Sequence, residues 1–219
     1  MVKIIELGAN NTILNNYLAE LRNVEVQGDR MRFRKNLERI GELMAYEISK
    51  TLDYETVNIT TPLGEKEMNI MVDQPVLATI LRAGLPMHQG FLNVFDKADN
   101  AFIAAYRKYD KNEDFEIRIE YYSAANIDGR VLMLVDPMLA TGSSLVQCLD
   151  GLLHDEMKPS KLHLAAVIAS AEGVDYVKKK LSKYDATLWI GNIDDELTAK
   201  AYIVPGLGDA GDLAYGEKE

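Results

Sequence analysis

The stretch Arg130–Leu153, RVLMLVDPMLATGSSLVQCLDGLL, decides the fold of this chain of 219 residues. Its first half is an apolar run that ends in an acid, Asp136, and its second half carries apolar residues at helical spacing. A short turn of small and hydroxyl side chains lies between the two halves. This order predicts a buried strand over 131–135, then a turn, then a helix over 143–153. A strand that leads through a turn into a helix is the repeating unit of an α/β sheet.

The same alternation continues on both sides of this stretch. Short apolar strands are predicted at VLATILRA, AFIAAYR, KLHLAAVIAS and ATLWIG, and a further helix over 172–181. Strands that are apolar on both faces suit a mostly parallel sheet flanked by helices. The length fits one such domain, so we expect residues 1–219 to form a single α/β domain.

Two segments stand apart from this alternation. Two helices, over 11–21 and 30–51, are expected to open the chain, followed by a hairpin that turns at Pro62–Gly64. Residues 110–122 are charged and then alternate between polar and apolar side chains. This pattern fits an exposed hairpin arm, which would serve as a lid or an oligomer contact, and it fits an extension of the sheet equally well.

Composition excludes several classes of function. The net charge is −10 and the isoelectric point is about 4.9, so the chain has no overall attraction for nucleic acid or for an anionic membrane. Cys148 is the only cysteine and sits in an apolar pattern, which indicates a buried thiol and no intrachain disulfide. The chain shows neither a signal peptide at its start nor an apolar run long enough to span a membrane, and we expect a cytoplasmic protein.

The turn after Asp136 has the chemistry of a phosphate site. Ligands of open α/β sheets bind at the carboxyl ends of strands, where Asp136 is placed. The segment Ala140–Ser144 is small and rich in hydroxyls, and it leads into a helix whose free N–H groups favour an anion. Ser and Thr at such a place more often simply cap the helix. The acid at the strand end and the proline after it favour phosphate binding.

DPMLATGSS resembles the phosphoribosyl pyrophosphate (PRPP) motif of type I phosphoribosyltransferases, in the form found in the uracil phosphoribosyltransferase family. ILRAG and AAYR resemble two further family segments, and they place Arg82 and Arg107 after apolar strands. The planar guanidinium group of arginine pairs with two phosphate oxygens at once. YIVPGLGDAGD, over 202–212, is the most specific match and resembles the uracil-binding loop of that family. We interpret this segment as an irregular loop whose backbone can match the acceptor–donor–acceptor edge of uracil, which cytosine cannot present.

The resemblance covers nearly the whole chain and implies a type I phosphoribosyltransferase fold with a small hood and a β-arm. Residues 1–55 and the loop 201–216 would form the hood. Catalysis would fall to Asp136, Arg82, Arg107 and Asp209. The residues implied to bind PRPP are Arg82, Arg107, Asp136, Pro137, Met138, Leu139, Ala140, Thr141, Gly142, Ser143, Ser144 and Asp209. Those implied to bind uracil are Ile203, Gly208, Asp209 and Ala210.

The implied activity is pentosyl transfer: uracil and PRPP give UMP and diphosphate. Mg²⁺ would be carried by the diphosphate of PRPP, bridged by water to Asp209, and no residue would bind it directly. The implied partners are the two substrates and further copies of the chain, in a dimer or a tetramer. A regulator built on this fold, or a silent homologue, is the alternative. Ser143, Pro86, His88, Gln89 and Leu213 depart from the family pattern, and so does the tail after Gly216, but none removes a contact named above.

Overall fold

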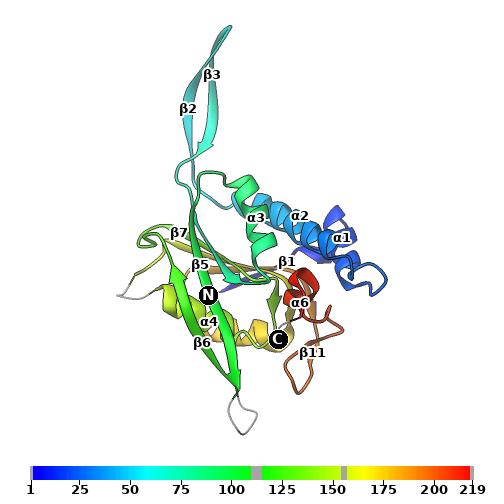
Figure 1. The fold of residues 1–219 in the computed structure, drawn as a ribbon. Coiled ribbons are helices and arrows are strands. Elements are labelled where there is room, and N and C mark those ends of the chain that lie inside the picture. The colour runs from blue at the N-terminus through cyan, green and yellow to red at the C-terminus, as the bar shows by residue number, and fades with distance from the viewer. Residues whose placement is uncertain (1, 110–114, 154–156, 218–219) are drawn as a thin grey trace.

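The computed structural model describes residues 2–109, 115–153 and 157–217, with the backbone alone over 105–109 and 115–122. A single large sheet of eight strands forms its centre (Figure 1). Its main path runs β1 (Lys3–Glu6), β10 (Ala186–Asp194), β9 (Lys161–Ser170), β7 (Val131–Val135), β4 (Val76–Leu81), β5 (Asp99–Tyr109) and β6 (Phe115–Ser123). Short β8 (Met138–Leu139) adds to β9. Every pairing is parallel except that of β5 with β6, which confirms the mostly parallel sheet.

Helices cover both faces of the sheet because its strands are apolar on both sides. In β7, Leu132 and Leu134 belong to one core cluster, whereas Met133 and Val135 belong to the other. The first cluster is closed by α4 (Ser143–Leu152) and α5 (Ala171–Lys180). The second is closed by α1 (Ile13–Arg22), α2 (Arg30–Ser49) and α3 (Leu85–Val94). The predicted α/β layering is therefore confirmed.

The start of the chain differs from its prediction. The expected opening helices exist, but strand β1 and a short 3-10 turn, η1 (Leu7–Ala9), precede them. β1 is an edge strand that pairs in parallel with β10, with Ile4 opposite Leu188. Four residues carry too little periodicity to show a strand in the sequence, and its stability comes from a partner far along the chain. Helix α1 starts two residues later than expected because the hydroxyl of Thr12 accepts a hydrogen bond from the N–H of Leu14 and caps it.

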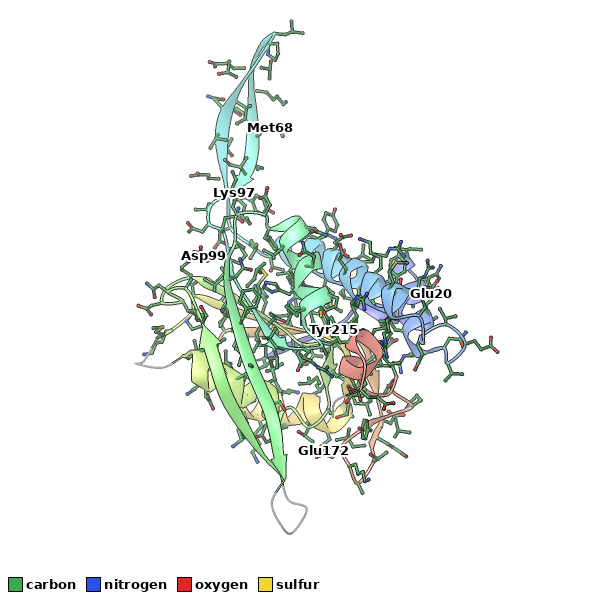
Figure 2. The ribbon with its side chains drawn as sticks, viewed as in Figure 1. Glu20, Met68, Lys97, Asp99, Glu172 and Tyr215 are labelled. Carbon is green, nitrogen blue, oxygen red and sulfur yellow. The ribbon has the colours of Figure 1, made fainter. Side chains whose placement is uncertain are left out.

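Two hairpins extend from the body. β2 (Tyr54–Thr61) and β3 (Gly64–Met71) pair in full register and project as an arm, on which Met68 is labelled (Figures 1 and 2). This is the hairpin that the sequence predicted at Pro62–Gly64. β6 runs antiparallel along β5 from Ser123 to Phe115, so the segment that could be either an arm or an extension does extend the sheet. Residues 110–114, which connect the two strands, lie outside the described part of the chain.

The end of the chain also corrects its prediction. The segment expected to be wholly irregular contains β12 (Ile203–Val204), which pairs with β11 (Glu196–Leu197), and helix α6 (Ala210–Tyr215). The carboxylate of Asp209 accepts a hydrogen bond from the N–H of Asp212 at 3.0 Å and caps α6. Gly and Asp at this spacing were interpreted as loop signals, but here they build a cap and a short helix. Among the described residues, no helix is long and apolar enough to cross a membrane.

His163 makes the fold sensitive to acid. It is 4% exposed in β9, its Nδ1 accepts a hydrogen bond from the indole N–H of Trp189 at 3.2 Å, and burial lowers its pKa to about 4. The unfolded chain therefore takes up this proton below about pH 6.5, whereas the folded chain resists it. Stability should fall as the pH drops from about 6.5 through 4, and the His163 contribution should approach about 3 kcal/mol.

We predict that His163→Asn, which keeps an acceptor for Trp189 but cannot titrate, reduces this loss. The measurement is the melting temperature of both proteins at pH 7, 5.5 and 4.5. The variant can start less stable because of the space left by the ring, but its melting temperature should fall less between pH 7 and pH 4.5. Parallel curves for the two proteins would contradict the assignment.

Candidate functional site

The site is set by the carboxyl ends of the parallel strands. Asp136 follows β7, Arg82 follows β4, and Asp194 ends β10. Because these strands are parallel within one sheet, their carboxyl ends lie along the same side of the sheet, which we call the carboxyl edge. The turn after β7 is fixed there, since the carbonyl of Pro137 accepts hydrogen bonds from the N–H groups of Val167 and Ile168 in β9, each at 3.1 Å.

The turn that leads into α4 forms a small cavity of about 30 Å³. It is lined by Asp136, Met138, Leu139, Ala140, Thr141, Gly142, Ser144 and Leu145. Gly142 is the N-cap residue of α4, and it supplies no side-chain cap to the helix. The structure thus places the predicted phosphate residues around one hollow at a helix N-terminus, which suits an anion. Ser143 lies beside it, with its Oγ at 2.8 Å from the Oγ1 of Thr141.

Gly142 is needed for the shape of this turn. Its φ is +76°, and a Cβ at this position would lie 2.9 Å from Cγ2 of Val177 and 3.0 Å from the carbonyl oxygen of Gly173. Both neighbours are on α5, so the turn and that helix are in contact without a side chain between them. The hydroxyl of Ser170 donates to the carbonyl of Ala140 at 2.6 Å and closes the same contact.

The buried thiol predicted at Cys148 is confirmed, and His88, on the other side of the sheet, is buried as well. Cys148 is fully buried in α4, and burial, followed by the charge of Asp136, raises the pKa of its thiol to about 12. It is therefore protonated at neutral pH and unsuited to act as a nucleophile. His88 is buried in α3, and its Nε2 lies 2.8 Å from Oδ1 of Asn100. Burial lowers the pKa of His88, which favours a neutral structural ring.

Arg82 contacts the C-terminal segment directly. Its Nη2 donates to Oδ1 of Asp212 at 3.1 Å and to the carbonyl oxygen of Gly216 at 3.2 Å. Its Nε is buried and has no hydrogen-bond partner among the described residues. The Leu81–Arg82 peptide bond is cis. Two segments that resemble different family motifs and lie 130 residues apart are thereby joined by one guanidinium group.

The residues predicted to bind uracil are Gly208 and three others that lie on either side of it in the chain. Ile203 and Ala210 are buried, at 4% and 2% exposure, and Asp209 caps α6 as described above. Gly208 has a φ of +95°, and a Cβ there would meet only the side chain of Leu213, at 3.8 Å. The backbone of Gly208 thus faces open space in a conformation that favours glycine.

An open cavity of about 330 Å³ lies beside this segment. It is lined by Gln27, Gly28, Arg30, Gly208, Asp209, Asp212, Leu213 and Glu217. It shares no lining residue with the smaller cavity at the phosphate turn. The Arg107 side chain lies outside what the structure describes, and its backbone pairs with Ile117 across β5 and β6.

Several residues at this site were missed by the sequence analysis. Asp212 pairs with Arg82, and Arg34 of α2 donates to the carbonyl of Ala214 at 2.6 Å and lies 5.8 Å from the centre of the Tyr215 ring. Figure 2 shows Tyr215 on α6, beside the helices of this face. Asp212 stands three residues after Asp209, as the first turn of a capped helix requires, and this spacing was the one available signal. Arg30 and Arg34 lie in the predicted helix over 30–51, and nothing in the sequence distinguishes them from its other charged residues.

Among the residues that the structure describes, no group of three or more His, Cys, Asp or Glu side chains is placed to coordinate a metal ion. One carboxylate oxygen of Asp209 is engaged by the cap of α6. The other carboxylate oxygen of Asp209 could accept a hydrogen bond from a water ligand of a divalent ion that phosphate oxygens carry.

Comparison with known proteins shows which family the chain resembles. The family model described as uracil phosphoribosyltransferase matches residues 9–217. The uracil phosphoribosyltransferase of Porphyromonas gingivalis is 51% identical over 217 residues, which cover 99% of this chain and 100% of that protein. The protein of the same name from Methanococcus vannielii is 39% identical over 203 residues, with 91% of this chain and 84% of that protein covered.

A solved structure, that of the AQ2163 protein from Aquifex aeolicus, superposes with a TM-score of 0.85 at 30% identity. The match covers 97% of this chain and 98% of that one. The sequence relatives, the family model and the shared fold all extend over nearly the full length. The chain therefore belongs to the uracil phosphoribosyltransferase family.

Proposed function

We propose that this protein is a uracil phosphoribosyltransferase, a pentosyltransferase that converts uracil and PRPP into UMP and diphosphate. The observation that carries the proposal is the hydrogen bond from Arg82 to Asp212, which brings a diphosphate-type arginine against the segment that resembles a uracil loop. Full-length relatives that bear this name support it. The activity belongs to pyrimidine salvage, since it recovers a free base as a nucleotide.

In the proposed binding mode, the smaller cavity takes the 5-phosphate of PRPP and the larger cavity lies beside the uracil site. The 5-phosphate of PRPP would lie in the turn Ala140–Ser144, over the N-terminus of α4. Asp136 would hold the ribose hydroxyls and stabilise positive charge on the sugar as the bond to diphosphate breaks. Arg82 and Arg107 would bind the departing diphosphate through their planar guanidinium groups. The residues Pro137, Met138 and Leu139 would shape the floor of the turn.

Uracil would be read by the backbone of Ile203 and Gly208, with Ala210 beside it. Its N1 atom forms the new bond to the anomeric carbon as the bond from that carbon to diphosphate breaks, and the N1 proton is released to water with the departing diphosphate. Catalysis by such a site rests on positioning and on charge stabilisation. Mg²⁺ bound to the diphosphate oxygens would neutralise charge on the leaving group. Asp209 would reach that ion through water.

The proposed domain organisation follows from the same contacts. Residues 1–219 form one domain, in which the C-terminal segment 201–216 and the N-terminal part of the helical layer make the hood. The contact of Arg34 with Ala214 supports this, because it ties α2 to α6. β1, within the first 55 residues, belongs to the central sheet and is outside the hood. A cytoplasmic homo-oligomer, dimer or tetramer, is the proposed working state.

The experiment that tests the function is a panel of free bases. The protein is incubated with PRPP, Mg²⁺ and uracil, cytosine, orotate or hypoxanthine, and nucleotide and diphosphate are both quantified. Uracil alone should give substantial amounts of both products. Cytosine and hypoxanthine lack the acceptor–donor–acceptor edge, and orotate, which shares that edge, differs by a carboxylate beside the reacting N1. Comparable turnover of orotate or hypoxanthine would overturn the assignment. No turnover of any base would favour a silent homologue.

The role of Asp136 is tested by Asp136→Asn. Turnover should fall by about two to three orders of magnitude, as for loss of one electrostatic group in the transition state. The fold should persist, because Asp136 follows β7 at the ligand edge and is not part of the apolar core. Single-turnover rates and the melting temperature are measured on the same preparation. A variant that turns over near the normal rate would show that Asp136 does not face the sugar.

The role of Gly208 is tested by Gly208→Val, with Gly28→Val as the matched control. Gly28 lines the same cavity, but it lacks the positive φ of Gly208 and has nothing within 4 Å of an added Cβ. A β-branched residue at a φ of +95° is strained and would shift the backbone that reads the base. Uracil-dependent diphosphate release should be lost in Gly208→Val and largely kept in Gly28→Val. Calorimetry should show ribose 5-phosphate binding in both.

If Gly208→Val turns over uracil normally, the base is read elsewhere. If both variants lose activity to the same extent, crowding of the cavity is the cause, and the backbone of Gly208 has no special part in it.

A further inference from the structure

A ring of hydrogen bonds encloses the backbone of Gly206, two residues before Gly208. The N–H of Gly206 donates to Oδ2 of Asp194 at 3.0 Å. Arg22 donates from Nη1 to the same carboxylate oxygen at 2.8 Å and from Nη2 to Oδ1 at 2.9 Å. Nη1 also donates to the carbonyl of Gly206 at 3.0 Å, so both backbone polar groups of this residue are held.

The ring is assembled from three distant parts of the chain. Arg22 is the last residue of α1, Asp194 is the last residue of β10, and Gly206 lies beyond β12. Asp194 is 8% exposed and Arg22 22% exposed, so water competes weakly for these bonds. A two-point pair between a guanidinium group and a carboxylate fixes orientation as well as distance. The Arg22–Asp194 pair therefore fixes the position of the backbone just after β12.

The far end of the same segment is held as well. Asp209 caps α6, and α6 is tied to α2 by the bond from Arg34 to Ala214. Between the two anchors lie only Leu207 and Gly208. Leu207 is buried, at 4% exposure, whereas Gly208 has no side chain to hold it. Glycine has the widest conformational freedom of all residues, so the geometry at Gly208 must come from its anchors.

We infer that Arg22 and Asp194 are positioning residues for the base site: they hold the 206–209 backbone in the geometry that reads uracil. The inference rests on the proposed function, since it assigns the base to Gly208. Neither side chain lines either cavity described above, so the role we assign to them is positioning and not contact with the substrate. Their effect is on the placement of backbone donors and acceptors, where a shift of about 1 Å can change rates by about 100-fold.

Two variants test this. Asp194→Asn keeps the shape of the side chain but puts an NH₂ group in place of one carboxylate oxygen. At Oδ1 this removes the bond from Nη2 of Arg22, and at Oδ2 it removes the bonds from Nη1 of Arg22 and from the N–H of Gly206. Arg22→Lys keeps the charge but cannot make the two-point pair. In both, kcat/KM for uracil should fall about 10- to 100-fold, chiefly through a higher KM for uracil. The Kd for ribose 5-phosphate, measured by calorimetry, should be unchanged.

Glu20→Gln is the matched control. Glu20 also lies on α1, at the right of Figure 2, and also makes a two-point pair, with Arg32. That pair joins α1 to α2, and within the described part of the chain no hydrogen bond or ion pair links it to the C-terminal segment. Glu20→Gln should therefore leave the KM for uracil unchanged, although it removes an ion pair of the same kind. An equal rise in KM in this control would overturn the inference.

A second measurement does not depend on activity. Hydrogen exchange of the peptide that spans 203–209 is followed in the substrate-free protein. Exchange should be faster in Asp194→Asn than in the wild type and unaltered in Glu20→Gln. If the wild type fails to use uracil, the proposed function fails, and the exchange data still decide whether the ring holds this backbone.

Three further outcomes would overturn the positioning role. The first is a normal KM for uracil in both Asp194→Asn and Arg22→Lys. The second is unchanged exchange over 203–209 in Asp194→Asn. The third is equal loss of ribose 5-phosphate and uracil binding in Arg22→Lys, which would mean general damage to the fold.

Discussion

Burial of the central sheet on both faces is the constraint on which the rest of the structure depends. β4, β7 and β9 have no face for water, so helices must cover both sides and only the edges and ends of the strands stay accessible. The parallel direction gathers the strand ends of one polarity at one edge. Asp136, Arg82 and Asp194 stand together at this edge for that reason. Polar side chains at the strand ends do not have to be buried in the apolar core, and the rigid sheet holds them in place.

Close backbone contacts shape the turns at that edge. The phosphate turn packs on α5 through Gly142, with room for no side chain. The turn after β12 is similar, since a Cβ on Gly206 would collide with the carbonyl of Ile203. In both places glycine lets one backbone lie on another, and hydrogen bonds then fix the contact. The site is therefore built largely from peptide groups, and its few charged side chains orient those groups.

The parts of this design that could be predicted from sequence are those with a local signature. The strand before Asp136, the turn after it and the helix from Ser143 follow from apolar spacing and residue size over two dozen positions. β1 could not be predicted, because its four residues are stable only against β10. The bonds from Arg22 to Asp194 and from Arg82 to Asp212 join residues 172 and 130 positions apart, and no periodicity marks them. A helix residue such as Arg22 looks like any solvated arginine until the chain is folded.

Under the proposed function, the pairing of Arg82 with Asp212 accounts for how so acidic a chain would bind a polyanion. A net charge of −10 opposes the approach of diphosphate, so attraction has to come from local groups. A guanidinium group held by a carboxylate is already oriented, and its orientation entropy is lost on folding and not on binding. Replacing one anionic partner by another also leaves the net desolvation of the arginine small. Under the proposed function, Arg82 thus exchanges a weak internal anion for the stronger one that arrives with the substrate.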